Sequence, residues 1–211
     1  PLTLERDLSS YVMDNILYKV SFPAEFHAQT AAEAALKLNI QLSDKLEEID
    51  KIIIETQESG MRIISKEGPL TNYADRDHCI EYIVVWCLLN GILDSDSYSD
   101  DSASDPRIDT LREKTTTLEN KKYTEIYYDL NHRAIPNKVI VKLNSGEEFE
   151  EEMLYPLGHK KRREEAISFL REKFVNSMDN IDLDKDKLIN FYDIDDLDSI
   201  NIYKILENIT K

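Results

Sequence analysis

The hydrophobic and small residues of the chain fall into short segments, and the period of each segment predicts one kind of element. Residues 23–38 begin with a proline and are rich in alanine, which predicts a helix that lets a neighbouring element approach closely. Residues 50–57 contain three consecutive isoleucines, a β-branched run typical of a buried strand. Residues 76–90 are mostly apolar and predict a buried helix, capped by Asp75 or Asp77. Glycine then follows, at the position where a helix commonly ends.

The middle of the chain begins with an acidic, serine-rich stretch. Residues 94–105 have almost nothing to bury, so they predict a solvated loop. Asp105 followed by Pro106 is typical of a helix start, and we expect that helix to run to about Leu118. Residues 124–128 predict a short strand.

The last regular patterns are a hairpin and an amphipathic helix. Residues 139–143 and 148–154 flank a turn in which Gly146 supplies a positive φ, so we expect a β-hairpin. Residues 160–178 repeat apolar side chains every four positions, as in a helix with one apolar face. The elements together predict an α+β fold, with a small antiparallel sheet and packed helices.

Composition narrows the classes of partner. Among 211 residues, 42 Asp and Glu outweigh 26 Lys and Arg, giving a net charge of -16. Nucleic acid requires a clustered positive surface, so we expect no nucleic-acid partner. No apolar run approaches the length of a membrane span, so we expect no membrane partner either. An anionic substrate must therefore find a local basic pocket within a repelling field.

The two cysteines, Cys79 and Cys87, indicate a reducing compartment. They lie eight residues apart on one predicted helix, a rise of about 12 Å that is too long for a disulfide. Their spacing is not that of metal ligands, and we expect no metal. The chain starts at Pro1 without an initiator methionine, so we expect a processed product or a piece of a longer protein.

His27 is the first candidate for chemistry. It follows Pro23 near the predicted start of its helix, where the helix dipole favours the neutral imidazole. A neutral imidazole is a useful base or hydrogen-bond donor. The alternative is a structural histidine bonded to a backbone carbonyl.

Arg76 and His78 form a second candidate near another predicted helix start. Arginine recognises carboxylates through two parallel hydrogen bonds, and free backbone N–H groups add to an anion site. The alternative is an aspartate cap surrounded by surface ion pairs.

The dense basic run 159–163 (HKKRR) stands out in an acidic chain. Positive charge at a helix start is unfavourable, so a bound polyanion, or Glu164 and Glu165, would offset it. A solvated charged helix end is the alternative.

The tail, residues 179–211, is acidic and carries a last predicted helix at 200–209. Residues 182–193 resemble a calcium loop in their first five positions. Lys187 stands where the loop needs glycine, and Asp193 where it needs glutamate, so an acidic solvated linker is the favoured interpretation.

Two motifs carry a family resemblance, SFPAEFHAQTAAEAA at 21–35 and GPLTNYADRDHC at 68–79. With further stretches they resemble the C-terminal part of the MmgE/PrpD family, in its 2-methylcitrate dehydratase branch. The matching stretches are 1–35, 61–64, 68–82, 105–114 and 155–163, and the resemblance covers the chain from residue 1 to about 178.

The resemblance implies a two-domain enzyme in which a large all-helical domain is covered by a smaller α+β lid. Residues 1–15 would lead in from the helical domain, residues 16–155 would form the lid, and residues 156–211 would return to the helical domain as a helix and an acidic tail. The implied reaction is the dehydration of 2-methylcitrate to 2-methyl-cis-aconitate in the methylcitrate cycle of propionate catabolism, without an iron–sulfur cluster or another cofactor.

The resemblance also assigns roles. His27 matches the family's lid histidine and is the candidate catalytic residue, while Arg76 and His78 are candidates for binding the carboxylates of a tricarboxylate substrate. The partners implied are that substrate, the preceding helical domain and, as an option, a second copy in a homodimer. Without the helical domain we expect the chain to be inactive. The location implied is the cytoplasm in a bacterium or the mitochondrial matrix in a eukaryote.

Three alternatives remain at this stage. The chain could act on a related tricarboxylate, as a cis-aconitate decarboxylase does. It could be a non-catalytic module that binds a partner through the helix at 160–178. It could bind calcium through its tail.

Overall fold

The computed structural model describes residues 16–42, 44–177 and 203. The chain divides into two units, Pro1–Arg162 and Arg163–Lys211. The first unit contains the sheet and its helices, and the second contains helix α9 (Arg163–Ser177). Within the described ranges, every helix is too short or too polar to cross a lipid bilayer.

A four-stranded sheet organises the first unit. Its strands are β1 (Ile49–Thr56), β2 (Thr115–Glu119), β3 (Asn137–Leu143) and β4 (Glu148–Met153), in the order β2-β1-β3-β4. The predicted α+β class is confirmed. The predicted antiparallel sheet holds for β1 with β3 and β3 with β4, whereas β1 and β2 are parallel. A parallel pair needs a long crossover, and the helices between β1 and β2 provide it.

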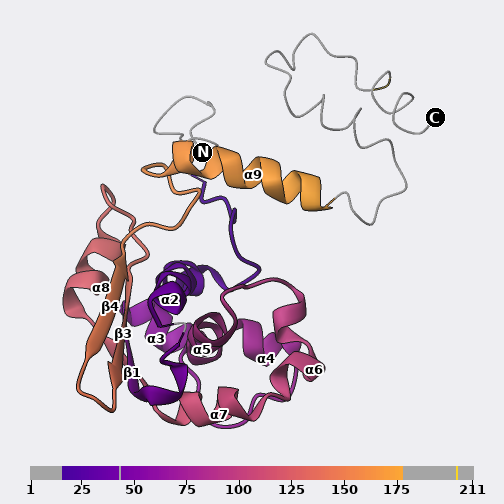
Figure 1. Ribbon diagram of the computed structural model, residues 1–211. Coiled ribbons are helices and arrows are strands. Elements are labelled where there is room, and N and C mark those ends of the chain that lie inside the picture. Colours follow the sequence, from indigo (N-terminus) through magenta and orange to yellow (C-terminus); the bar gives the residue numbers. More distant parts are fainter. Residues whose placement is uncertain (1–15, 43, 178–202, 204–211) are drawn as a thin grey trace. The chain divides into compact units, whose positions relative to one another are not determined.

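Helices cover one side of this sheet, where Figure 1 shows α2, α3 and α5 together. In the described part of the unit, the helices are α2 (Gln29–Leu42), α3 (Glu58–Ile64), α4 (Tyr73–Asp77), α5 (Ile80–Asn90), α6 (Asp100–Ala103), α7 (Pro106–Glu113) and α8 (Lys121–Tyr128). The same part contains short 3-10 turns at η1 (Phe26–Ala28), η2 (Leu46–Glu48) and η3 (Asp96–Tyr98).

The core lies between α2, α5 and the sheet. Helix α2 packs against α5, β3 and β4. It does so with alanines that are fully buried, and their small side chains allow the close approach predicted from sequence. On the strands, alternate residues such as Ile52, Ile54 and Val139 are buried in the same cluster. Some of the intervening residues form ion pairs across strands, as Lys138 does with Glu150 at 2.6 Å.

The helix predicted at 23–38 begins later than expected and runs further. Its first regular turn is η1, and α2 ends at Leu42. Glu25 is extended, with ψ 148°, and its backbone N–H donates to the Asp77 carbonyl at 3.1 Å. This long-range bond holds the chain after Pro23 in a loop, which a local pattern cannot reveal.

The helix predicted at 76–90 is two helices, α4 and α5, separated at His78 and Cys79. In a continuous helix the Asp77 carbonyl would accept from Glu81, but here it accepts from Glu25. Neither predicted aspartate caps α5; the side chain of Asn72 caps α4 instead, accepting the Asp75 N–H at 3.0 Å. The predicted end of α5 at Gly91 is confirmed, with φ 67°.

The loop predicted at 94–105 is partly helical, because it contains η3 and α6. Tyr98 anchors this segment to the core, which the polar composition did not indicate. Its side chain is fully buried and its ring stacks on Tyr82, with 6.0 Å between centroids. A buried aromatic ring thus helps to hold an otherwise polar segment on the core, together with the Tyr82 hydroxyl, which donates to the Ser97 carbonyl at 2.7 Å.

The helix predicted from Pro106 starts where expected but ends earlier. Asp105 caps α7 by accepting the Arg107 N–H at 2.9 Å, as predicted, but α7 ends at Glu113 and β2 takes the residues beyond it. The strand predicted at 124–128 is wrong, since these residues complete α8. Asn120 caps that helix and Tyr123 buries one side of it. The β-hairpin of β3 and β4 is confirmed, with Gly146 at φ 86°.

The second unit is described by α9, which confirms a helix in the region predicted at 160–178 and starts three residues later. Ala166 is buried, while Ile167 and Leu170 are exposed. The predicted helix at 200–209 and the calcium-like segment at 182–193 lie outside the described residues.

Candidate functional site

The loop before α2 presents His27 on a turn that its own neighbours fix. Glu25 precedes η1, and its carboxylate accepts the His27 backbone N–H at 2.7 Å. The Gln29 side-chain amide donates to the carbonyls of Phe22 and Ala24, each at 2.9 Å. Local polar side chains therefore satisfy this loop and hold the imidazole at one place.

The imidazole of His27 lies between a carboxylate and a phenol. Its Nδ1 is 2.9 and 3.0 Å from the two carboxylate oxygens of Glu25, and its Nε2 is 3.0 Å from the Tyr127 hydroxyl. A carboxylate can only accept, so Nδ1 carries a proton. In the neutral imidazole Nε2 then accepts from the Tyr127 O–H. The His27 side chain is 13% exposed, so it is shielded but still reachable.

Glu25 remains ionised beside this imidazole. Burial alone would raise its pKa, but hydrogen bonds from His27 and the charge of His27 outweigh burial and lower the pKa from its ordinary value of 4.5. An ionised carboxylate on Nδ1 fixes the tautomer and stabilises the imidazolium when Nε2 takes a proton. The arrangement can therefore perform acid–base chemistry at Nε2.

Asn137 ties this turn to the sheet. Its side-chain amide donates to the His27 carbonyl and to the Thr30 hydroxyl, each at 2.7 Å. Asn137 is fully buried at the start of β3. The position of His27 therefore rests on a strand 110 residues further along the chain.

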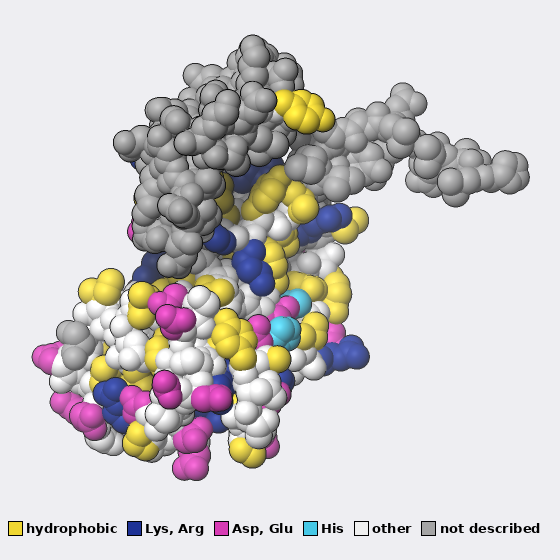
Figure 2. Space-filling model, turned by 90° about the vertical axis from the view of Figure 1, so that its right-hand side faces the viewer, with side chains coloured by type: hydrophobic (Ala, Val, Ile, Leu, Met, Phe, Trp, Pro, Cys, Tyr) yellow, Lys and Arg dark blue, Asp and Glu magenta, His cyan; other side chains and the backbone are white. Residues whose placement is uncertain are grey.

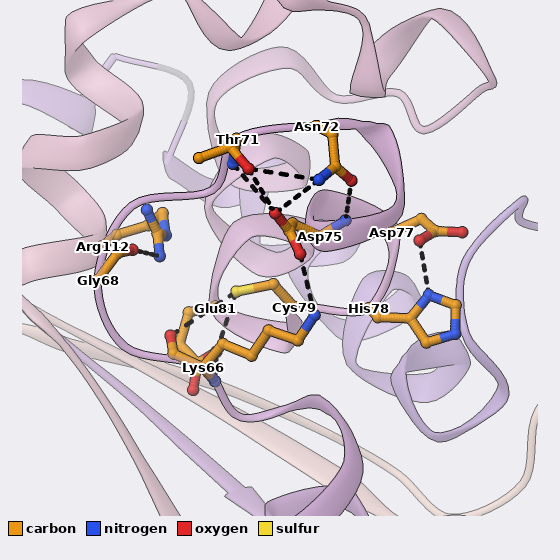
Figure 3. Close-up of polar contacts among 10 residues, drawn as sticks. All are labelled: Lys66, Gly68, Thr71, Asn72, Asp75, Asp77, His78, Cys79, Glu81 and Arg112. Atoms are coloured by element: carbon orange, nitrogen blue, oxygen red, sulfur yellow. Dashed lines mark hydrogen bonds and ion pairs between the residues drawn. The ribbon is translucent and has the colours of Figure 1, made fainter.

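His78 lies beside the His27 loop. The bond from the Glu25 N–H to the Asp77 carbonyl brings the two segments together, so both predicted histidines belong to one neighbourhood. The His78 side chain is 48% exposed, and its Nδ1 is 2.6 Å from an Asp77 carboxylate oxygen (Figure 3). On the face shown in Figure 2, histidine side chains reach the surface beside acidic and hydrophobic ones.

Arg76 has a different environment. It is buried, and one guanidinium nitrogen donates to the Tyr98 carbonyl at 2.7 Å and lies 2.8 Å from Asp100. It lines a cavity of about 160 Å³ together with Arg112. Its visible contacts hold η3 and α6 onto α4, and none of them joins it to His27.

A larger cleft, of about 650 Å³, is lined by none of the three predicted site residues, although it shares Arg112 with the cavity beside Arg76. One of its walls is Glu81, a buried carboxylate that accepts from Ser65 Oγ at 2.7 Å and Thr117 Oγ1 at 2.6 Å. The backbone N–H of Lys66 and the thiol of Cys79 complete its shell (Figure 3). Because four protein donors satisfy this carboxylate, its contacts are structural, and the size of the cleft does not by itself mark a reaction site.

Sequence reasoning missed the partners of His27. Glu25 stands inside the first motif, and a carboxylate two residues before a histidine was an available signal. Tyr127 is 100 residues away and lies on a segment predicted as a strand, so no local pattern links it to His27. Within the described ranges, no three His, Cys, Asp or Glu side chains gather as they would around a metal ion.

The chain is similar to a known enzyme family over most of its length. Residues 22–190 match the family described as MmgE/PrpD C-terminal domain. The mitochondrial 2-methylcitrate dehydratase of Yarrowia lipolytica is 50% identical over 179 residues, which cover 82% of this chain and 34% of that protein. The 2-methylcitrate dehydratase of Escherichia coli K12 is 47% identical over 174 residues, 81% of this chain and 36% of that protein. The chain thus spans about a third of the length of these relatives.

Proposed function

Because the chain belongs to the MmgE/PrpD family, we propose that it is the C-terminal part of a hydro-lyase that converts 2-methylcitrate to 2-methyl-cis-aconitate. The relatives named 2-methylcitrate dehydratase, which are nearly half identical over most of this chain, support the choice of substrate. The reaction would belong to the methylcitrate cycle, in the cytoplasm of a bacterium or the mitochondrial matrix of a eukaryote.

The observation that carries the proposal is His27 held between Glu25 and Tyr127. Dehydration requires a base for the proton next to a carboxylate and an acid for the departing hydroxyl. His27 Nε2 serves as the acid–base group, with Glu25 stabilising the imidazolium. The Tyr127 hydroxyl, 3.0 Å from Nε2, occupies the position that a reacting group of the substrate would take.

The carboxylates of the substrate need cationic or donor groups. His78 is the better placed of the two predicted ligands, because it is exposed and its segment is bonded to the His27 loop. Arg76 would have to release Asp100, whose carboxylate is itself 87% exposed, in order to meet a substrate. We therefore assign substrate contact first to His78.

We propose the domain organisation that the family resemblance implies. Residues 16–155 form an α+β lid, residues 1–15 lead in from a helical domain, and residues 156–211 return to it. The remaining catalytic groups lie in the helical domain, so the 211-residue chain is inactive alone.

The test is a dehydration assay that follows the ultraviolet absorbance of the unsaturated product. The full-length protein should form 2-methyl-cis-aconitate from 2-methylcitrate, while this chain alone should form none. Release of CO2 from cis-aconitate by the full-length protein, without dehydration of 2-methylcitrate, would refute the proposed substrate in favour of a decarboxylase. Turnover by the isolated chain would refute the division of the site between two domains.

A further inference from the structure

A further, smaller cavity lies where three distant segments of the first unit meet. It is a cavity of about 120 Å³ lined by Leu17, Arg133, His159 and Lys160. The turn that carries His159 is pressed against the N-terminal segment, since a Cβ at Gly158 would lie 2.3 Å from the Tyr18 carbonyl oxygen. The walls are therefore held by close backbone packing as well as by side chains.

Two of its lining side chains are cations with no carboxylate partner among the described residues. Across residues 16–42 and 44–177, neither the Arg133 guanidinium nor the Lys160 ammonium has a hydrogen bond or ion pair. The acidic groups nearby are engaged: Asp129 lies 2.6 Å from His132 Nδ1, and Glu33 forms two bonds to Arg162 at 2.8 and 2.9 Å. Two unneutralised cations at one cavity are conspicuous in a chain of net charge -16.

Two other members of the basic run have roles of their own, and Lys160 is the run's charged member at the cavity. Arg162 is fixed by Glu33 and by the Tyr155 carbonyl at 2.7 Å. The Lys161 ammonium donates to the Tyr155 hydroxyl at 2.9 Å and lies over that ring. The members of the run therefore have different surroundings and do not act as one uniform group.

His159 forms a buried, uncharged wall of the cavity. Its Nδ1 accepts the Lys161 backbone N–H at 3.2 Å, and its ring stacks on Tyr155 with 4.7 Å between centroids. Burial lowers its pKa first, and the charges of Lys160 and Lys161 lower it further. The positive charge at the cavity therefore comes from Arg133 and Lys160.

Arg133 also stands at a strained position that points to function. Its φ is 45°, in the left-handed region that a residue with a side chain adopts at a cost of about 1–2 kcal/mol. The segment that follows it runs beside the His27 helix, where the Ile135 carbonyl accepts from Thr30 Oγ1 at 2.6 Å and Asn137 reaches the His27 carbonyl. The same segment thus fixes both the cavity and the imidazole.

We propose that Arg133 and Lys160 bind one carboxylate of the substrate in this cavity. A volume of about 120 Å³ accommodates a carboxylate on a short arm but not a whole tricarboxylate, so the remainder of the substrate extends out of it. Guanidinium and ammonium groups are the natural partners of such a carboxylate. The identity of the ligand as substrate rests on the proposed function, whereas the cavity and its charge do not.

Direct binding to the 211-residue chain tests the site without any catalysis. Tricarballylate, a tricarboxylate that cannot be dehydrated, should shift the NMR signals of Arg133 and Lys160. Arg133→Gln should weaken that binding by about tenfold or more, the effect of losing a hydrogen bond between charged groups. The matched control is Arg107→Gln, which removes an exposed arginine paired with Asp105 and should leave binding unchanged.

The outcomes separate the possibilities. Equal weakening by both arginine variants, or none by Arg133→Gln, would overturn the site. Inorganic phosphate bound as tightly as tricarballylate would overturn the carboxylate assignment. In the full-length protein, Arg133→Gln and Lys160→Gln should each raise KM about tenfold and change kcat little, while the control Lys161→Gln should do neither. A full-length protein that fails to dehydrate 2-methylcitrate would refute the proposed function, and the binding experiment would still decide on the cavity.

Discussion

Replacing Glu25 by glutamine tests whether the carboxylate orients His27. The carboxylate accepts one backbone N–H at 2.7 Å and one imidazole N–H at 2.9 Å, and its side chain is 15% exposed. Glutamine keeps one acceptor oxygen but loses the charge. Hydrogen bonds to charged groups contribute about 1.5–3 kcal/mol, and partial exposure weakens them, so we expect a loss of about 1–2 kcal/mol in the free energy of unfolding.

Catalysis should suffer more than stability. The amide N–H₂ can donate to Nδ1, which would move the imidazole proton to Nε2 and remove the base. We expect kcat of the full-length protein to fall about 100-fold or more, as acid–base groups typically contribute factors of that size. Glu58→Gln is the control, because Glu58 is a glutamate bonded to Tyr128 and outside the site. A Glu25→Gln enzyme with kcat within about threefold of the wild type would refute the orienting role.

The difference in stability between wild type and Glu25→Gln should decrease as the pH falls. The pKa of Glu25 is lowered on folding, so its stabilising contribution is complete above its ordinary value of 4.5 and is lost as pH falls through the folded-state value. Urea unfolding of the 211-residue chain should therefore separate wild type from Glu25→Gln at pH 7, with the gap narrowing below pH 4.5. A gap that widens with falling pH would contradict the assignment.

Three further predictions concern the fold itself. Glu81→Ala leaves one buried donor and three partly buried donors without their acceptor, and it should reduce the free energy of unfolding in urea by about 2 kcal/mol or more. A loss below about 1 kcal/mol would show that those donors find other partners. Gly158→Ala places an alanine at φ 92° and brings its Cβ into a clash with the Tyr18 carbonyl, so it should lower the free energy of unfolding by at least about 2 kcal/mol. The loss should be clearly larger than for Gly146→Ala, whose new Cβ meets nothing within 4 Å. Burial, followed by the charge of Glu81, raises the pKa of the Cys79 thiol to about 12. A disulfide reagent at pH 8 should therefore label this thiol only as fast as the chain unfolds. Rapid labelling of the native chain would contradict its burial.

Local patterns predicted the elements whose determinants are local. The isoleucine run of β1, the hairpin turn at Gly146 and the Asp105 cap each depend on residues within a few positions. The alanines of α2 correctly predicted close packing. These features follow from periodicity and capping, which a single sequence displays directly.

The errors arose where distant residues decide the local structure. The split between α4 and α5 depends on a bond from Glu25, and the folding of 94–105 depends on a core site for Tyr98. The candidate site shows the same limit. The sequence singled out His27, but its partner Tyr127 joins it only through the packing of α8, which the pattern had assigned to a strand.

The most direct test of the account is the kcat of the full-length protein carrying His27→Ala, measured with 2-methylcitrate and followed by the absorbance of the unsaturated product. We predict a loss of about 100- to 10,000-fold in kcat, a decrease of no more than about 2 kcal/mol in the free energy of unfolding, and partial recovery of activity when free imidazole is added. A variant that remains within about threefold of the wild type would show that His27 is a structural residue and that the acid–base chemistry lies elsewhere.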